Sequence, residues 1–193
     1  MPKSAEFFLR LLQRRTAFQS LPQDHVYKLL VSASDGTVDM NIDASGGAVN
    51  FDYIVPAGTV YDIFMFSRLN FVIVDGNIRW GRFAGLGAAL NNGVLLQVLD
   101  DNDVIQQHFS TDVHPLRTNE DFGGLTGVDN VIRLAAGDDA IPIRFSIFKS
   151  GNTMTLFPNW RVRVVIQDNL SEISHMDGLV QGILKRTREA KIS

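Results

Sequence analysis

Apolar residues alternate with polar residues along much of this chain, and this pattern limits the possible folds more than any other feature. Every second residue is apolar between positions 38 and 42 and again between 49 and 55. Successive side chains of a strand point to opposite faces, so a period of two predicts half-buried strands. Similar runs predict further strands at 59–66, 69–74, 94–99, 104–110, 128–134, 141–149, 154–157 and 160–167.

Turn-forming residues separate these runs. Ser45-Gly46-Gly47, Asp75-Gly76 and Asn91-Asn92-Gly93 are typical of tight connections between strands. The acidic residues are 17 Asp and only 4 Glu, which also favours turns over helix interiors. No amphipathic helices separate the strands, so we expect an all-β, antiparallel β-sandwich that is jelly-roll-like.

The alternation also predicts which side chains point into the core. We expect inward side chains at Val38, Met40, Phe51, Tyr53, Phe71, Ile73, Leu95, Ile143, Val162 and Val164. Residues 111–127 have little periodicity and predict a long surface loop. Residues 170–184 fit a helix or a strand, and the cost of Gly178 and Gly182 within a helix favours an edge strand.

The first twenty residues differ from the rest of the chain in the spacing of their apolar residues. This spacing predicts an amphipathic helix at 4–14. Its apolar side chains fall within an arc of ~140°, opposite Glu6 and Gln13. We therefore divide the chain into an N-terminal helix or arm (1–20), one β-sandwich domain (21–184) and a basic C-terminal tail (185–193). At 193 residues, a single core is large enough to stabilise this sandwich.

A helix this short is marginal alone and must dock on something. It docks either on its own domain or on a partner or membrane surface. In the second case it forms a subunit-docking element, whose candidate residues are Phe7, Phe8, Leu11, Leu12, Arg10 and Arg14. Deleting residues 1–15 separates the two cases, because loss of assembly without unfolding indicates a partner.

Charge is distributed unevenly along the chain. Residues 1–15 and 185–193 each carry a net charge of +3, although the whole chain carries −3. The basic ends are either solvated tails or attract an acidic neighbouring subunit. No apolar run approaches the ~18 residues of a membrane-spanning helix, so we expect no membrane span.

The familiar signatures of catalysis and cofactor binding are missing. The chain has no cysteine, and His108 and His114 lack the spacing that pairs metal ligands. Asp100, Asp101 and Asp103 lack the Gly and Glu of a calcium loop, which favours a turn. Gly85-Leu86-Gly87 is not followed by the Gly-Lys-Ser/Thr of a phosphate loop. We therefore expect no enzyme, no metal and no cofactor.

A cationic strand face also has two interpretations. Arg161 and Arg163 share one face beside Trp160. A single-stranded nucleic-acid site needs several exposed aromatics at strand spacing, which argues against nucleic acid. We expect these arginines to pair across strands with aspartates or to form a subunit contact.

Three stretches together resemble the small β-sandwich virion proteins of tailed bacteriophages. The first combines residues 67–76 (SRLNFVIVDG) and 86–94 (LGAALNNGV). The second is 163–170 (RVVIQDNL), near the end of the chain, and the third is 180–182 (VQG). The resemblance covers about residues 35–184. It implies a non-enzymatic structural subunit at the capsid surface, neck or tail, with no active-site residue.

Two functions follow from this interpretation. The first is a virion subunit, assembled in the host cytoplasm, whose partners are copies of itself and other virion proteins. Sheet edges in such an assembly are covered by pairing between copies. The alternative is a monomeric ligand- or carbohydrate-binding module, for which Trp80, Trp160 and the three tyrosines are the candidate aromatic residues.

Overall fold

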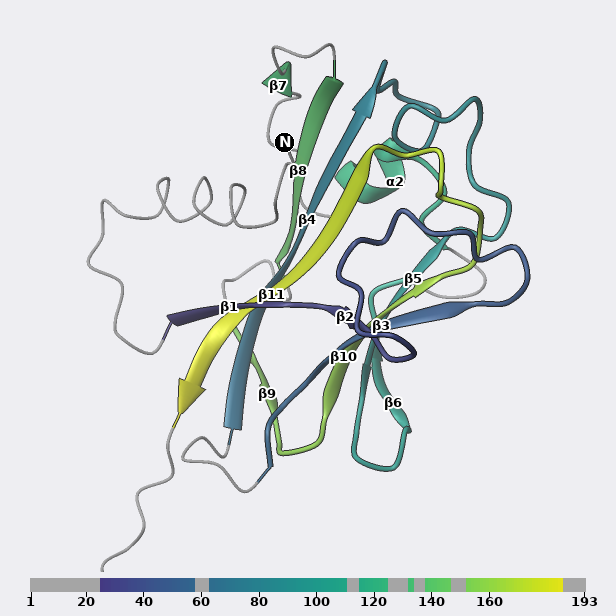
Figure 1. The fold of residues 1–193 in the computed structure, drawn as a ribbon. Helices are drawn as coiled ribbons and strands as arrows, with labels where there is room; N and C mark the ends of the chain where they lie inside the picture. The colour runs from purple at the N-terminus through teal and green to yellow at the C-terminus, as the bar shows by residue number, and fades with distance from the viewer. Residues whose placement is uncertain are drawn as a thin grey trace, which may run out of the picture.

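A computed structural model describes residues 25–57, 63–110, 115–124, 132–133, 138–146 and 152–185. Within these residues the chain forms two antiparallel β-sheets packed as a sandwich, together with one short helix (Figure 1). Every strand pair described is antiparallel, as the turn-rich sequence predicts.

The larger sheet, sheet A, contains six strands. Its order is β1 (His25–Leu29), β11 (His175–Lys185), β4 (Ile63–Gly76), β8 (Asp138–Ser146) and β7 (Ile132–Arg133). The first part of β4 pairs with a further strand, β9 (Met154–Leu156). The long strand β4 therefore has two successive neighbours on the side away from β11.

The smaller sheet, sheet B, contains five strands. Its order is β2 (Val31–Ser32), β3 (Val49–Ile54), β10 (Arg161–Ile166), β5 (Val94–Leu99) and β6 (Ile105–His108). The chain passes from sheet A to sheet B at Leu30, which separates β1 from β2. It passes again at residues 157–160, between β9 and β10. The short helix is α2 (Asn119–Gly124).

The core lies between the two sheets and is rich in phenylalanine. Its largest fully buried side chains include five aromatic rings: Phe51, Phe64, Phe66, Phe71 and Phe83. Tyr53 packs edge to face on Phe64, with ring centroids 5.2 Å apart. Each fully buried ring contributes on the order of 2–3 kcal/mol of transfer free energy. The described segments therefore have a core that needs no disulfide.

Most side chains predicted to point inward do so. The confirmed members of the core cluster are Met40, Phe51, Tyr53, Phe71, Ile73, Ile143, Val162 and Val164. Two predictions were wrong. Val38 is only half-buried and lies in an irregular segment. Leu95 is buried but lies outside the core cluster, on the opposite face of β5 from Val94 and Leu96.

Several predicted elements change in the structure. Residues 38–42 form no strand, and the described part of the predicted strand 59–66, residues 63–66, joins residues 69–74 in the single strand β4. The segment 170–184 contains a strand, β11, but β11 lies between β1 and β4 instead of at an edge. The predicted loop 111–127 contains α2. The predicted helix 4–14 and residues 186–193 lie outside the described residues.

Candidate functional site

The residues predicted to dock on a subunit lie outside the described part of the chain. These are Phe7, Phe8, Leu11, Leu12, Arg10 and Arg14. The candidate surfaces of the described residues belong to the sandwich itself. They are the outer face of sheet B, meaning the face turned away from sheet A, a loop at residues 77–93, and a buried histidine cluster.

An arginine–aspartate network occupies the centre of the outer face of sheet B. Arg163 on β10 lies directly opposite Asp52 on β3. Its guanidinium donates two hydrogen bonds to the carboxylate, from Nε at 2.8 Å and from Nη2 at 2.7 Å. This bidentate contact with a nearly buried carboxylate raises the pKa of Arg163 further. The expected cross-strand pairing is confirmed here.

Arg161 extends the network toward the edge of the sheet. Its guanidinium lies 3.1 Å from Asp103 and 3.9 Å from Asp52. Asp103 is exposed and belongs to the turn that precedes β6. The two arginines are thus neutralised by two aspartates of the same chain. A partner that covers this face meets charges that are already paired.

Exposed apolar side chains border this network. Val31, Ile54 and Ile105 are 39%, 49% and 39% exposed, and Val104 beside Ile105 is 54% exposed. All four residues of the edge strand β6 are also exposed. An apolar rim beside an edge strand with free backbone groups has the composition of a contact surface.

The loop at residues 77–93 is fixed by three polar side chains. The Asp75 carboxylate accepts the backbone N–H groups of Gly76 and Gly85, both at 2.8 Å. The Asn119 side chain accepts from the Ala84 N–H and donates to the carbonyl oxygens of Arg79 and Ala84. Asn119 is buried, so these bonds tie the loop firmly to α2.

The far end of the same loop is fixed by Asp168. Its carboxylate accepts the N–H groups of Asn91, Asn92 and Gly93, the last at 2.7 Å. Gly93 has φ near +80°, a conformation that favours glycine. Trp80 projects from this well-ordered loop with 56% of its surface exposed. A rigid loop that displays a tryptophan is suited to binding.

We predict that Asp168→Asn destabilises the fold by about 2 kcal/mol. The asparagine side chain places an NH₂ group opposite the backbone N–H donors that Asp168 binds. It also lacks the negative charge that strengthens hydrogen bonds from these donors. Urea unfolding measures the change. The matched control is Asp43→Asn. Asp43 is exposed, and its carboxylate accepts a hydrogen bond from one local backbone donor, the N–H of Ser45. The expected change in stability for this control is within ~0.5 kcal/mol. Equal effects of the two substitutions contradict the prediction.

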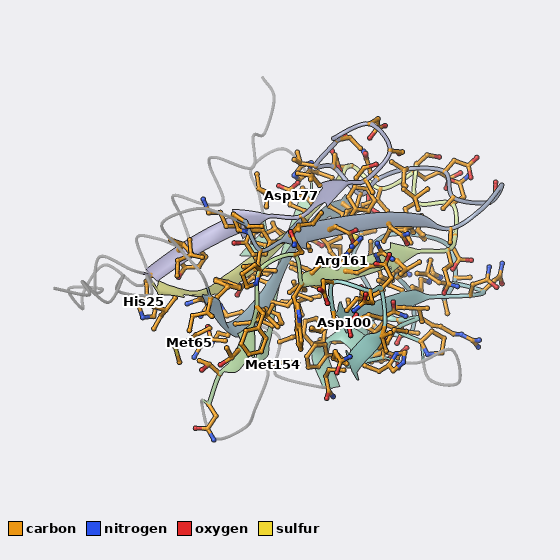
Figure 2. All side chains as sticks on the ribbon, turned by 90° about the horizontal axis from the view of Figure 1, so that it is seen from below. His25, Met65, Asp100, Met154, Arg161 and Asp177 are labelled. Atoms are coloured by element: carbon orange, nitrogen blue, oxygen red, sulfur yellow. The ribbon has the colours of Figure 1, made fainter. Side chains whose placement is uncertain are left out.

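A buried charge cluster lies where β11 begins. The imidazole of His175 contacts Asp39 Oδ2 through Nδ1 at 2.7 Å and Asp177 Oδ2 through Nε2 at 2.8 Å. The contact with Asp39 is a hydrogen bond, whereas Asp177 lies off the N–H direction of Nε2 and forms an ion pair without a well-aligned hydrogen bond. Figure 2 labels Asp177 on sheet A and Arg161 on sheet B.

The two carboxylates control the protonation of this histidine. Asp177 first and Asp39 second raise the pKa of His175 to about 10, against the opposing effect of burial. Burial opposes ionisation of Asp39, but its bonds with His175 and the Met176 N–H leave the Asp39 pKa lowered. At neutral pH His175 is therefore a positively charged imidazolium, held between the side chains of Asp39 and Asp177.

Asp177 is the unusual member of this cluster. It is only 1% exposed, and no described residue donates a hydrogen bond to either of its carboxylate oxygens. Such groups occur both at functional sites and in structural ion pairs. In the described part of the chain, His175 contacts one carboxylate through each ring nitrogen, an arrangement typical of a structural ion pair.

The other predicted motifs have structural roles in the described residues. The Asp100 Oδ1 atom accepts the N–H groups of Asn102 and Val104, which makes residues 100–104 a turn. Gly85 contacts Asp75 instead of forming a phosphate loop. Among the residues that the structure describes, no cluster of His, Asp or Glu is arranged to hold a metal ion. No helix in this part of the chain is long and apolar enough to cross a membrane.

Sequence reasoning missed the histidine cluster, although one signal was available. His175 and Asp177 are two residues apart on one strand, a spacing that places both on the same face. Asp39 joins them from a segment 136 residues away, which no local pattern reveals. Comparison with protein families, with curated proteins and with solved structures finds no match for this chain.

Proposed function

We propose that this protein is a non-enzymatic structural subunit that assembles with copies of itself through the outer face of sheet B. The observation that carries the proposal is the apolar rim of Val31, Ile54 and Ile105 around a charge network that is already neutralised. Association removes the rim from water, while the arginines and aspartates keep their partners.

The edge strand β6 supports a second copy as the occupant. Two β6 strands related by a two-fold axis are antiparallel, so each edge presents the same backbone pattern to the other. Such pairing satisfies exposed N–H and C=O groups that a single copy leaves to water. The exposed Ile105 lies within this strand, so the rim and the edge are continuous.

Charge placed on the rim tests this proposal. Ile54→Glu and Ile105→Glu should each weaken self-association at least tenfold, because each places a carboxylate in the contact. Thr155→Glu is the matched control, since it adds the same charge at an exposed position of sheet A. Sedimentation velocity over a range of concentrations measures the association. A wild-type protein that stays monomeric at high concentration overturns the proposal.

The finer proposal is that the assembly is the virion of a tailed bacteriophage, at its capsid surface, neck or tail. It rests on the resemblance of residues 67–76, 86–94, 163–170 and 180–182 to small virion proteins. Genes for a portal, capsid or tail protein beside the gene for this chain are the expected result. A neighbourhood of metabolic genes contradicts a virion role without affecting the self-association test.

One observation favours a second function, that of a monomeric carbohydrate-binding module. Trp80 is exposed on a loop that Asp75, Asn119 and Asp168 hold in place. The chain has two tryptophans, so Trp80→Phe leaves Trp160 as an internal reference for fluorescence. A sugar-dependent change in emission that this substitution abolishes, in a protein that stays monomeric, favours the module.

A further inference from the structure

Sheet A is buried on both of its faces around residues 70–74 of β4. Phe71 and Ile73 of β4 belong to the core, whereas Val72 and Val74 form a second, separate cluster with Ala140. Alternate residues of a strand point to opposite faces, so this second cluster lies on the face turned away from sheet B. Its side chains are 1%, 0% and 1% exposed.

Two further buried side chains extend this cluster. Pro142 on β8 lies opposite Val72, and Leu179 on β11 follows Asp177 on the same face. We call the five residues Val72, Val74, Ala140, Pro142 and Leu179 the outer patch. Sheet B packs on the opposite face, and the structure contains a single chain. A segment of the same chain must therefore exclude water from the outer patch.

We propose that residues 4–14 dock on the outer patch of their own chain. This segment has an apolar stripe of Phe7, Phe8, Leu11 and Leu12 that complements the five apolar side chains of the outer patch, which share this face of sheet A with the buried Asp177. As a helix it is about 16 Å long. The outer patch crosses β11, β4 and β8, which spans about 10 Å at the usual strand spacing. One such helix is long enough to cross all three strands.

The connection to β1 favours docking within the chain. Ten residues, 15–24, separate the segment from His25, and ten extended residues reach about 33 Å. Strand β1 is three positions from β8, or about 14 Å. A tether of this length gives an effective concentration in the millimolar range. A second copy competes poorly with a segment that is already attached beside the patch.

Residues 125–131, which precede β7, are the main competing occupant. They include Leu125, Val128 and Val131, and they lie close to β8 in sequence. Their apolar residues lack the helical stripe that residues 4–14 provide, which favours the N-terminal segment. The competing segment is an outcome of the experiment below.

A disulfide-trapping experiment tests the proposal, because the chain has no cysteine of its own. Leu11→Cys is combined in turn with Val72→Cys, Ala140→Cys and Leu179→Cys. The control is Gln13→Cys, on the polar side of the segment, with the same three partners. After oxidation of dilute monomer, at least one Leu11 pair should give an intramolecular disulfide with a yield at least tenfold above its Gln13 control. Non-reducing gels and mass spectrometry identify the product.

Other products overturn the proposal. Disulfide-linked dimers place the segment on a second copy, and no disulfide above the control level indicates another occupant such as residues 125–131. Hydrogen exchange gives an independent measurement. Removing residues 1–15 should speed exchange at least tenfold in the amides of β4 and β8, while β3 and β10 of sheet B are unchanged. Both measurements use monomer, so they do not depend on self-association.

Discussion

Replacing His175 with alanine should destabilise the protein by about 3–5 kcal/mol at pH 7, the usual cost of removing one partner from a buried ion pair. The substitution removes the cationic partner that the described residues provide for the buried Asp177 side chain. Guanidinium unfolding measures the loss. His108→Ala is the matched control, because His108 is exposed on β6, and its effect should stay within ~0.5 kcal/mol.

The same cluster predicts how stability depends on pH. Folding raises the pKa of His175 from 6.5 to about 10, so the folded state binds the proton more tightly than the unfolded state. Its contribution is fully present below pH 6.5 and is lost as pH rises toward 10. The expected loss is on the order of 3–5 kcal/mol.

Unfolding at a series of pH values between 6 and 10 checks this prediction. The wild type should lose stability across this interval, and His175→Ala should lose much less because it lacks the titrating group. Lysines, the N-terminal amine and tyrosines also titrate near the upper end, so the difference between the two proteins is the quantity to compare. Parallel curves for the two proteins refute the assignment to His175.

Gly182→Ala should also be strongly destabilising, by about 3 kcal/mol or more. A Cβ atom at Gly182 meets the carbonyl oxygen of Met65 and the ring of Phe64. The carbonyl belongs to β4, which pairs with β11, so relief of the clash requires backbone movement in the middle of sheet A. Urea unfolding again measures the effect.

Two other glycines provide a graded comparison. A Cβ at Gly178 lies 2.7 Å from Leu30 Cδ1 and 2.7 Å from Met40 Cε, the ends of flexible side chains, so Gly178→Ala should cost only about 1–2 kcal/mol. Gly46 has open space around it, and Gly46→Ala should change stability by less than ~0.5 kcal/mol. Any other order of the three substitutions contradicts the packing argument.

Strands were predictable from the sequence where clear breaks bound an apolar run. β5 occupies 94–99 as predicted, between Gly93 and Asp100, and β10 at 161–166 lies within the predicted 160–167. The direction of Leu95 was not predictable, because Val94, Leu95 and Leu96 are all apolar and leave the phase of the alternation undefined. Leu95 is buried as well, although it lies on the face of β5 that is turned away from the core.

The alternation at 38–42 was misleading for a different reason. Asp39 accepts the N–H groups of Asn41 and Met176, and the Met40 N–H donates to the Met176 carbonyl. Polar side chains that bond to nearby backbone compete with regular strand pairing. The polar side chains of this segment therefore form hydrogen bonds near the start of β11 instead of facing water along a strand.

A polar pair inside β4 was mistaken for a break between two strands. Ser67 and Arg68 interrupt the apolar pattern, but the register between β4 and β11 shifts there. Ser67 Oγ donates to the Gln181 carbonyl at 2.9 Å, so the hydroxyl supports the irregularity. One strand thus continues where the local sequence favours two.

The candidate surfaces were only partly visible in the sequence. The pairing of Arg163 with an aspartate was predictable from charge and strand spacing, but its specific partner Asp52 depends on the register of β3. The ties from Asn119 and Asp168 to residues 77–93 join distant segments through single side chains. Such contacts have no periodic signature, and the fold must be known before they can be found.

The position of β11 has a consequence for the rate of folding. Strand β11 lies between β1 and β4. Its pairing with β1 brings together His25 and Ile183, which are 158 residues apart in the sequence. The chain loses conformational entropy when such a loop closes, before the stabilising contacts between the strands have formed. Topologies of this kind therefore fold in milliseconds to seconds and not in microseconds. During that interval the facing edges of β1 and β4 remain open, and a chaperone that shields strands acts most usefully then.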